Sequence, residues 1–592
     1  MSNSITERVE ALRQWMRQHS LDAFIIPSTD PHCGEYVPEH WMTRQWISGF
    51  DGSAGTAVVT LSDAALWTDS RYFIAAAEQL QGTPFRLMKD GLPSTPSITE
   101  WLCDSLAAGA TVGMDASVNT VADIRSMEHE LKASEMQVAV TDDPAELLWA
   151  DRPAIPMNPI VVQPMAYAGE TAENKIGRVR DSIRRQGASA IIISQLDEIA
   201  WLLNLRGSDV HCNPVFVGYV FLTLDSTTFF VDSAKVDSAT ADYLAAIGVG
   251  IRPYGDIEAA ISNYHDGVVA LDPNTANWLL FGPLAMGEVI EAPSPITAMK
   301  AIKNSAEIEG FRQAMLRDGV AMVRFLRWLK PAVEAGGQTE VSIDRKLTAL
   351  RAEQALYCGL SFDTIAGYGP HGAIVHYEAT PETDAPLEAH GLLLLDSGAQ
   401  YQDGTTDITR TIALGPLTDE ERLDYTLVLK GHIRLALTRF PDGISGTQID
   451  ALARYAMWQH GINYGHGTGH GVGSYLCVHE GPHQIRHTWK PAPLHAGMTV
   501  TNEPGIYRAG KHGVRTENTM LIVADGTTEF GSFLRLEPLT LCPIDTTPII
   551  LSMMQQDEID YLNTYHRHVR EALSPLLSAE ERDWLQEATK EI

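Results

Sequence analysis

Three histidines lie within one glycine-rich stretch of the chain, residues 463–482, which reads NYGHGTGHGVGSYLCVHEGP. They are His466, His470 and His479, and five glycines alternate with other residues around the first two. Glycine lets a backbone approach a ligand closely and adopt conformations that other residues avoid. Imidazoles on such a backbone can bind a metal ion or exchange protons near neutral pH. The stretch therefore predicts a site where histidines meet a substrate at short range.

Four acidic residues stand at the ends of apolar segments on either side of this stretch. Asp396 ends the apolar run of GLLLLDSGAQY, and Asp407 follows an Asp-Gly turn in DGTTDITRTIAL. Glu503 follows the short apolar strand of TVTNEPGIY, and Glu517 begins the strand of GVRTENTMLIV. A hairpin would bring the two aspartates side by side. Two solvated hairpin aspartates would give the same pattern, so this pair alone does not predict a site.

The four carboxylates together predict a metal site with two ions. Buried acids without partners are costly, and close carboxylates resist joint ionisation unless a cation lies between them. Two divalent ions would balance four carboxylates, and one imidazole from the glycine-rich stretch would complete the ligand set. Oxygen-rich ligation with a single nitrogen favours manganese, cobalt or iron over a sulfur–nitrogen zinc site. Such a centre binds a substrate oxygen and generates hydroxide near neutral pH.

A second metal motif overlaps the glycine-rich stretch. Residues 479–483, HEGPH, spell the H-E-x-x-H signature of many zinc proteases. That chemistry needs both histidines on one face of a helix. Proline disfavours the helical conformation in the residue before it, and the preceding SYLCV predicts a strand. The sequence therefore favours the carboxylate centre over a zinc protease centre.

The rest of the chain predicts an α/β scaffold that repeats. DAFIIP predicts a buried strand, and AGTAVVTL and AALWTDSRYF predict a hairpin that turns at Ser62 and Asp63. The same pattern returns after residue 187 in ASAIIIS, EIAWLLNL, FVGYVFLTL and STTFFVDSAKV. We therefore expect two related α/β domains of ordinary size, about 150 residues each.

Proline-rich segments mark the joints between the predicted domains. DRPAIPMNPI (151–160) follows the first domain, and EAPSPI (291–296) follows the second. A long amphipathic helix over AEIEGFRQAMLRDGVAMVRFLRWLKPAV then opens a larger third domain. We expect boundaries at 1–155, 156–297 and 298–592, with a C-terminal extension from about residue 540.

Composition limits the class of protein. The 592 residues carry a net charge of −31, which argues against binding to nucleic acid, because phosphate contacts need clustered Lys and Arg, and against an anionic membrane surface. The six cysteines are scattered without a C-x-x-C pair, which favours a reducing compartment. The first 20 residues predict an amphipathic helix instead of a signal peptide, and no run reaches the ~18 apolar residues of a membrane span. We expect a cytoplasmic protein.

The chain closely resembles the Xaa-Pro aminopeptidases (aminopeptidase P). These are pita-bread metallopeptidases, related to prolidase, creatinase and methionine aminopeptidase. DSGAQYQDGTTDITRT, GHGTGHGVGSYLCVHEGP, NEPGIY and RTEN carry the resemblance. FDGSAGTAVVT, WTDSRYF and EPLTLCPID match the long, three-domain cytosolic form, and the middle domain matches it more weakly. The implied fold is two related creatinase-type α/β domains followed by a pita-bread catalytic domain.

The resemblance implies a role for each site residue. Asp396 would bind one metal ion, Asp407 and Glu517 would bridge both, and His470 and Glu503 would bind the other. Glu503 would also orient or deprotonate the bridging water. The peptide contacts would be His376, His466, His479 and Arg71. His466 would help to shuttle protons, and Arg515 and Tyr507 would support the metal carboxylates. Arg71 could equally be a surface arginine in an ion pair, and His376 a core histidine.

The implied activity is metal-dependent hydrolysis of the N-terminal Xaa-Pro peptide bond by a water activated between two metal ions. Mn²⁺ would be the preferred ion, and Co²⁺, Fe²⁺ and Zn²⁺ would be alternatives. The substrates would be peptides with proline at position two, and family precedent implies a homodimer. Two alternatives stay open: an Xaa-Pro dipeptidase (prolidase) with the same centre, and a non-catalytic pita-bread module that binds peptides or proteins. The complete set of five ligands argues against the second alternative.

Overall fold

The computed structural model describes residues 4–592, and the chain divides into two compact units. The first unit contains the residues up to Gln163 together with Glu170–Thr297, and the second contains Pro164–Gly169 and Ala298–Ile592. The helix predicted over the first 20 residues is α1 (Ile5–Gln18), which Ser4 caps with its side chain. The first three residues of that prediction lie outside the described part of the chain.

A six-stranded sheet forms the beginning of the first unit, in the order β4-β3-β2-β1-β5-β6. The central strand β1 runs antiparallel to β2 and parallel to β5. The strands are β1 (Ala23–Ile26), β2 (Thr56–Thr60), β3 (Ala64–Thr68), β4 (Arg86–Lys89), β5 (Thr111–Asp115) and β6 (Gln137–Thr141). The helices after α1 are α2 (Thr43–Ser48), α3 (Phe73–Gln79), α4 (Ile98–Ser105), α5 (Val121–Leu131) and α6 (Ala145–Leu148).

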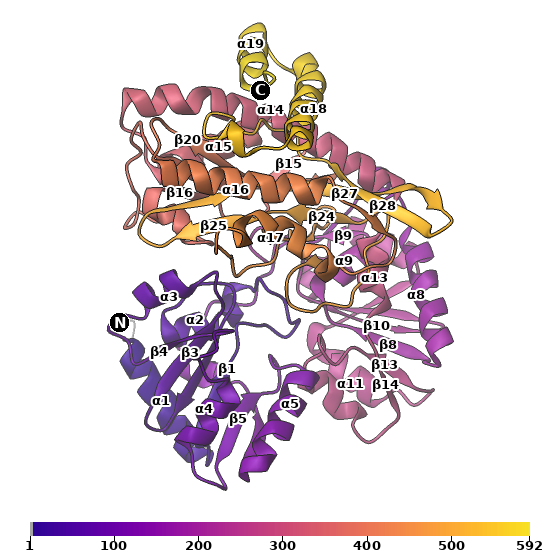
Figure 1. Ribbon diagram of the computed structural model, residues 1–592. Coiled ribbons are helices and arrows are strands. Elements are labelled where there is room, and N and C mark those ends of the chain that lie inside the picture. Colours follow the sequence, from indigo (N-terminus) through magenta and orange to yellow (C-terminus); the bar gives the residue numbers. More distant parts are fainter. Residues whose placement is uncertain (1–3) are drawn as a thin grey trace. The chain divides into compact units, whose positions relative to one another are not determined.

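A second six-stranded sheet in the same unit repeats this topology, in the order β12-β11-β10-β8-β13-β14. Its central strand β8 is antiparallel to β10 and parallel to β13, as β1 is to β2 and β5. The strands are β8 (Ala190–Ile193), β10 (Tyr219–Thr223), β11 (Thr227–Phe230), β12 (Val249–Arg252), β13 (Val269–Leu271) and β14 (Val289–Glu291). The helices are α8 (Ala172–Gln186), α9 (Leu196–Leu203), α10 (Ser238–Ala246), α11 (Ile257–Ser262) and α12 (Trp278–Phe281). Figure 1 shows each sheet with its own helices.

Two strand predictions in these sheets extend too far. AALWTDSRYF forms a strand only as far as Thr68, because the Asp69 carboxylate accepts a hydrogen bond from the Arg71 backbone N–H at 3.0 Å and turns the chain into α3. STTFFVDSAKV ends its strand at Phe230, and Asp232 then caps a short 3₁₀ turn. Side chains that bond to their own backbone compete with strand pairing. A short pair of strands, β7 (Val161–Val162) and β9 (Leu205–Arg206), also lies in this unit.

The second unit combines small antiparallel sheets with long helices (Figure 1). Its helices are α7 (Met165–Ala168), α14 (Ser305–Ala335), α15 (Glu340–Ala352), α16 (Asp419–Ala436), α17 (Asp450–Trp458), α18 (Gln556–Leu573) and α19 (Ala579–Ala588), and α13 (Pro295–Ala301) spans the boundary between the units. Its strands are β15 (Tyr357–Leu360), β16 (Ile365–Tyr368), β17 (Leu392–Ser397), β18 (Ala399–Tyr401), β19 (Gly404–Thr405), β20 (Ile408–Ala413), β21 (Arg439–Pro441), β22 (Gly469–Gly471), β23 (Glu480–Ile485), β24 (Thr499–Asn502), β25 (Gly505–Arg508), β26 (His512–Arg515), β27 (Asn518–Thr528) and β28 (Gly531–Pro538). The long helix predicted over residues 306–333 is α14.

The alternation of side chains along β17 decides where its acid points. Leu393 and Leu395 pack into one core cluster with residues of α14 and α15. Leu392 and Leu394 contact other clusters on the opposite face. Because side chains on a strand alternate between faces, Asp396 follows Leu394 and faces away from the α14–α15 core.

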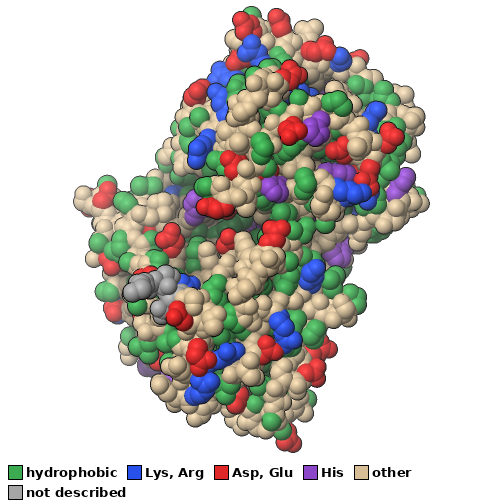
Figure 2. Space-filling view, turned by 90° about the vertical axis from the view of Figure 1, so that its left-hand side faces the viewer, with side chains coloured by type: hydrophobic (Ala, Val, Ile, Leu, Met, Phe, Trp, Pro, Cys, Tyr) green, Lys and Arg blue, Asp and Glu red, His purple; other side chains and the backbone are tan. Residues whose placement is uncertain are grey.

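The described surface and cysteines agree with the composition. Acidic side chains are spread over the face shown in Figure 2, and Lys and Arg side chains lie among them. All six cysteines are free thiols. Among the described residues, no helix has the length and apolar character needed to cross a membrane.

Candidate metal centre

Strand pairing brings the four acids together in two pairs. β17 and β20 are antiparallel with Asp396 opposite Thr409, so Asp407, two residues before Thr409, lies at the same end of the ladder. β24 and β27 are antiparallel with Asn502 opposite Asn518. Glu503 and Glu517 stand directly beyond that last pair. The Glu517 N–H donates to the Thr409 carbonyl at 3.1 Å, and this bond joins the two pairs into one cluster.

The pKa values of three of these carboxyls are raised because the cluster is buried and crowded with like charge. Burial, then the charges of Asp396 and Glu503, raise the pKa of Asp407 well above its usual range. Burial, then Asp407 and Asp396, do the same to the pKa of Glu517. Burial and the neighbouring Glu517 raise the pKa of Glu503 to about 8. Four ionised carboxylates in this space require positive charge between them.

Arg515 is the guanidinium that the chain supplies to the cluster. Its Nη2 donates to Asp396 Oδ2 at 2.6 Å, and its Nε donates to Thr409 Oγ1 at 3.2 Å. Thr409 Oγ1 in turn donates to Glu517 Oε2 at 2.8 Å. The other Asp396 oxygen, Oδ1, is buried and has no hydrogen-bond partner. An unpartnered buried carboxylate oxygen in an acidic cluster is the arrangement expected of a metal ligand.

His470 presents a nitrogen lone pair to the acids. Its Nδ1 lies 2.9 Å from the carbonyl oxygen of Gly471, which can only accept, so Nδ1 carries the proton. Nε2 then faces Asp407 Oδ2 at 3.4 Å and Glu503 Oε1 at 3.7 Å. A lone pair directed at two carboxylates is stabilised by a cation between them. The Nδ1–H bond to a carbonyl also orients the ring, as in many metal-binding histidines.

His466 lies at the end of a hydrogen-bond chain that begins at Arg515. Arg515 Nη1 donates to the Tyr507 hydroxyl at 2.7 Å, and this hydroxyl lies 2.7 Å from His466 Nε2. His466 Nδ1 donates to the Gly467 carbonyl at 2.7 Å, so Nε2 is the acceptor. Arg515 and Tyr507 thereby connect Asp396 to His466, whose Nδ1 is 4.0 Å from Glu503 Oε2.

His479 packs against His470, with ring centroids 4.4 Å apart. The strand predicted over SYLCV is wrong: residues 474–478 form bends, and His479 stands just before β23 instead of on a strand. Tyr475 has a left-handed φ of 50°, and the Gly473 N–H donates to the Cys477 carbonyl at 3.0 Å. The turn overrides the β propensity of the intervening side chains and delivers His479 to the centre.

The H-E-x-x-H motif does not form a zinc protease site. Glu480 and His483 lie on strand β23, not on a helix. Both Glu480 carboxylate oxygens accept from buried lysines, Oε2 from Lys300 at 2.8 Å and Oε1 from Lys303. His483 is fully buried, and its Nε2 donates to the Thr499 carbonyl at 2.7 Å. These contacts are structural.

The donor set fits a divalent cation. Asp407, His470 and Glu517 each offer a ligand atom, and the three atoms lie within 4.8 Å of one another. Glu503 Oε1 lies 3.7 Å from His470 Nε2, and the charge of Asp396 raises the pKa of both Asp407 and Glu517. When all are ionised, four carboxylates and the Arg515 guanidinium carry a formal net charge of −3, which two divalent ions would more than balance.

Family models match the chain along its length. The region 309–524 matches metallopeptidase family M24, and 532–592 matches the C-terminal region of peptidase M24. Two models of the creatinase/prolidase N-terminal domain match 8–151 and 151–307. The chain belongs to metallopeptidase family M24. The predicted fold class, two related α/β domains followed by a pita-bread catalytic domain, is therefore confirmed for this M24 member.

Full-length relatives of this M24 chain are named as Xaa-Pro aminopeptidases. The chain is 41% identical to a probable Xaa-Pro aminopeptidase P of Laccaria bicolor, over 98% of this chain and 92% of that protein. It is 39% identical to Xaa-Pro aminopeptidase 1 of Dictyostelium discoideum, over 97% and 94%. A solved structure of X-prolyl aminopeptidase from Caenorhabditis elegans covers 100% of both chains at 36% identity with a TM-score of 0.96. That protein is described as a cytosolic enzyme with a di-nuclear active site.

Similarity to a dipeptidase is weaker. The Xaa-Pro dipeptidase from Bacillus anthracis shares 25% identity with this chain and a TM-score of 0.52, and it covers 63% of this chain. The full-length similarity therefore lies with the aminopeptidases of the family.

The last two predicted site residues, His376 and Arg71, lie outside the segments that carry the four acids. His376 is half-buried in the segment between β16 and β17, and the preceding Val375 carbonyl accepts from Arg515 Nη2 at 3.4 Å. Arg71 belongs to the first unit, where its guanidinium pairs with Asp69 at 2.7 Å and with Glu35 at 3.3 Å. The ion pair that the sequence left open for Arg71 is present, and its contact with a peptide stays a prediction.

Sequence reasoning missed the threonines that bind the carboxylates of this cluster. Thr409 donates to Glu517, and Thr501 Oγ1 lies 3.5 Å from Glu503 Oε1 and accepts from the His470 N–H at 3.1 Å. Each threonine stands two residues from an acid, Thr409 after Asp407 and Thr501 before Glu503. Residues two apart on a strand share a face, so this spacing was the available signal.

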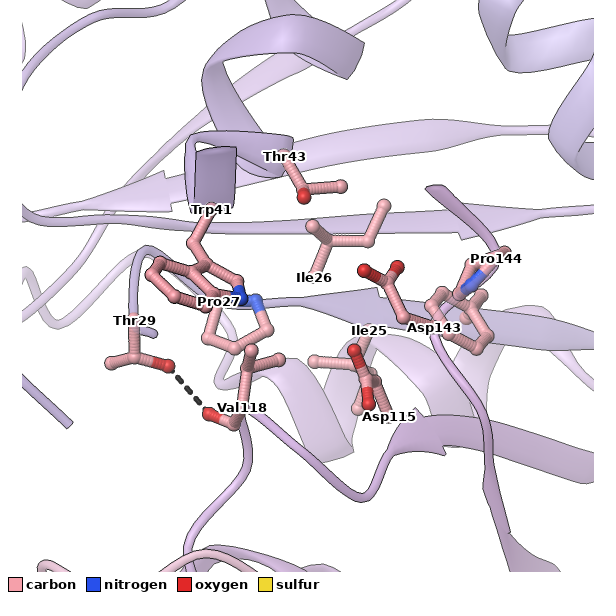
Figure 3. A pocket seen from close by; sticks show the side chains of 11 residues that line it. Ile25, Ile26, Pro27, Thr29, Trp41, Thr43, Asp115, Val118, Asp143 and Pro144 are labelled. Atoms are coloured by element: carbon pink, nitrogen blue, oxygen red, sulfur yellow. Dashed lines mark hydrogen bonds between the residues drawn. The ribbon is translucent and has the colours of Figure 1, made fainter. Parts of the chain in front are cut away.

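A buried acid, Asp115, and a half-buried acid, Asp143, line a cavity in the first unit. Figure 3 shows Asp115 and Asp143 on the wall of this cavity, together with Trp41 and the end of β1. Asp143 pairs with Arg152 at 2.7 Å and accepts from the Ala145 N–H at 2.8 Å. Asp115 accepts from the Ser117 N–H at 2.7 Å. Because the chain satisfies these acids with its own donors, this cavity lacks the ligand set of a metal centre.

Proposed function

We propose that the carboxylate–histidine cluster of the second unit is the active site at which this M24 peptidase removes an N-terminal residue that precedes proline. The observation that carries the proposal is the group of Asp407, His470 and Glu517, with ligand atoms within 4.8 Å and the unpartnered Asp396 Oδ1 beside them. Asp396, Asp407, His470, Glu503 and Glu517 hold two divalent ions. When bound, these ions activate a water molecule and polarise the scissile carbonyl.

Glu503 is the residue we assign to the proton of the attacking water. Its side chain is 17% exposed, compared with 5% for Asp407, so it is the more accessible of the two carboxylates beside His470. Thr501 and His470 hold it from one side. A carboxylate placed within hydrogen-bond reach of the water can accept its proton as a general base.

The histidines around the centre handle the peptide. An Xaa-Pro bond has no N–H, so the enzyme must recognise the free amine, the carbonyl and the proline ring. His479, which packs on His470, and His376 contact the peptide, and the leaving proline nitrogen takes its proton through these imidazoles. His466, fixed by Tyr507 and the Gly467 carbonyl, lines the pocket and completes the proton path. Arg71 is a further peptide contact by family resemblance.

The metal ion, the cellular location, the oligomeric state and the domain boundaries are proposed from the family resemblance and from the chemistry of the ligands. Mn²⁺ is the preferred ion because four carboxylates and one imidazole form an oxygen-rich ligand set. The protein works in the cytoplasm as a homodimer. The proposed domain boundaries are 1–155, 156–297 and 298–592. Sedimentation equilibrium of the purified protein tests the dimer, and a monomeric mass at micromolar concentration would refute it.

The experiment that tests the function compares peptides at one metal concentration. We expect kcat/KM to be higher for Xaa-Pro-Yaa and Arg-Pro-Pro peptides than for Xaa-Pro dipeptides, because an aminopeptidase leaves the side beyond proline open. Xaa-Ala-Yaa and N-acetylated peptides should be poor substrates, since they lack the ring or the charged amine. Faster cleavage of dipeptides would convert the assignment to prolidase. Binding of peptides without turnover would favour the non-catalytic module.

A further inference from the structure

Glu340 is a fully buried carboxylate that gathers donors from a single segment of the chain. It is the first residue of α15, and its side chain has no exposed surface. The donors are Tyr368 N–H at 2.8 Å, His371 Nδ1 at 2.9 Å, the Tyr377 hydroxyl at 2.8 Å and Ala385 N–H at 3.1 Å. All four belong to residues 368–385, which connect β16 to β17 and include His376. One carboxylate therefore binds both ends and the middle of this segment.

His376 lies between two anchors within that segment. On its N-terminal side, the Val375 carbonyl accepts from Arg515, which also binds Asp396. On its C-terminal side, the Tyr377 hydroxyl donates to Glu340, and the His371 ring packs on Tyr377 with centroids 4.5 Å apart. The position of His376 relative to the acids is therefore set by Arg515 on one side and by Glu340 on the other.

The start of the segment also packs tightly against the strand that carries Arg515. A Cβ added to Gly513 on β26 would lie 1.6 Å from the Gly372 carbonyl oxygen, so the two backbones touch without intervening side chains. Hydrogen bonds to an ionised acceptor are shorter and stronger than those between neutral groups. Glu340 thus ties this segment to the start of α15.

We propose that Glu340 is a positioning residue that holds His376 in place for the peptide, acting through Tyr377 and His371. This inference rests on the proposed role of His376 in the aminopeptidase reaction. Glu340 stands 56 positions before Asp396 in the chain and touches neither the substrate nor a ligand of the metal ions. Its effect on the reaction passes through the geometry of one histidine.

The test is a double-mutant cycle with Glu340→Gln and His376→Ala. The amide keeps the shape of the side chain but loses the charge and one acceptor oxygen, so the segment is held less firmly. We expect Glu340→Gln to lower kcat/KM for an Xaa-Pro-Yaa peptide by about 10- to 100-fold, the cost of a misplaced reacting group. The Glu340→Gln/His376→Ala double variant should be no slower than His376→Ala alone, because coupled residues are non-additive.

Two readouts separate positioning from a general loss of structure. Elemental analysis should find the same metal content in Glu340→Gln as in the unmutated protein. Hydrogen exchange should increase in residues 369–385 and not in β17 or β20. Glu307→Gln is the matched control, because Glu307 is also a buried glutamate in the first turn of a helix of the same unit and bonds to the Asn304 N–H. It should leave kcat/KM unchanged.

Each outcome decides the inference. Additive losses in the cycle, loss of metal in Glu340→Gln, or full activity in His376→Ala would overturn it. If Glu340→Gln does not fold, Tyr377→Phe removes one donor without changing charge and should show the same non-additivity with His376→Ala, and additivity there would also overturn it. An unmutated protein that cleaves no Xaa-Pro-Yaa peptide would refute the proposed function instead, and the exchange in residues 369–385 would still report whether Glu340 holds the segment.

Discussion

Two groups of acids, one in each unit, differ in where their positive charge comes from. In the first unit, Asp143 has Arg152 at 2.7 Å, and Asp115 accepts hydrogen bonds from Ser117. In the second unit, four carboxylates share Arg515, and one oxygen of Asp396 has no partner. Both groups contain a carboxyl whose pKa is raised by burial, Asp115 to about 7 and Glu503 to about 8.

The difference teaches that a raised pKa and a cavity do not by themselves identify a metal centre. Burial and a neighbouring carboxylate raise the pKa of an acid in either place. The acids of the second unit differ in two ways. The chain supplies them with too little positive charge, and the His470 Nε2 lone pair faces two of the carboxylates.

The largest effect is expected from Asp407→Asn. Losing one of the proposed metal-binding carboxylates should remove metal and lower kcat/KM for Xaa-Pro-Yaa peptides by at least about 10³-fold, because metal-ion catalysis supplies several kcal/mol. Asp115→Asn, the matched change in the first unit, should leave both metal content and rate unchanged. Elemental analysis beside kinetics measures the two effects. Metal loss in His483→Ala without metal loss in Asp407→Asn would instead favour the zinc protease motif.

Removal of metal should destabilise one unit selectively. Without ions, the four carboxylates repel one another, and the free energy of ligation is lost from the native state. A ligand at 100 times its Kd contributes about 2.7 kcal/mol per site, so chelation should lower the melting temperature by several degrees. Hydrogen exchange should increase in β17 and β20 but not in β1 and β5. Equal loss of protection in all four strands would contradict the assignment of the ions to the second unit.

Arg152→Met should take away the counter-charge that distinguishes the acids of the first unit from those of the second. It removes the cation beside Asp143 and should destabilise the protein by about 3 kcal/mol, the lower end of the range for breaking a buried ion pair. The midpoint of denaturant unfolding measures this loss in the free energy of unfolding. Arg184→Met removes an exposed pair with Asp181 and should have little effect. If Arg152→Met is harmless, or if it confers metal binding on the first unit, the structural role of Asp115 and Asp143 is wrong.

The smallest effect concerns pH. Burial, then the neighbouring Asp143, raise the pKa of Asp115 from 3.8 to about 7, so the folded chain binds this proton more tightly than the unfolded chain. Its contribution to stability is therefore present below about pH 4 and is lost as the pH rises towards 7. Asp115→Asn should remove this dependence and make the protein more stable than its parent at pH 7.5 by about 1–2 kcal/mol. Denaturant curves at pH 5 and pH 7.5 measure it, and a parallel shift at both values would count against the raised pKa.

The sequence predicted the parts of the fold that short apolar segments encode. β17, β20, β24 and β27 were predictable because their apolar residues run directly into or out of an acid, and this also brought the four acids together. The repeated topology of the first unit was predictable from the recurring strand and hairpin patterns. The SYLCV strand was wrong because the turn that begins at Gly473 decides the backbone there.

Contacts between residues far apart in the chain could not be read from local patterns. Glu340 bonds to residues 28, 31, 37 and 45 positions later, and nothing near Glu340 in the sequence marks it as more than a helix start. Lys300 and Lys303 likewise bond to Glu480, 180 and 177 positions later. These side chains acquire their partners only when the strands have paired. The spacing of Thr409 and Thr501 from the acids signalled their contacts. No such signal marked the contacts of Glu340, Lys300 and Lys303.

Titration of the metal-free protein with Mn²⁺, followed by elemental analysis and cleavage of one Xaa-Pro-Yaa peptide, tests the central claim most directly. We expect two ions per chain, turnover that appears as they bind, and neither binding nor turnover in an Asp407→Asn/Glu517→Gln variant. Asp115→Asn should bind both ions and turn over as its parent does. Full turnover in rigorously metal-free protein, or two ions retained in the Asp407→Asn/Glu517→Gln variant, would contradict the account.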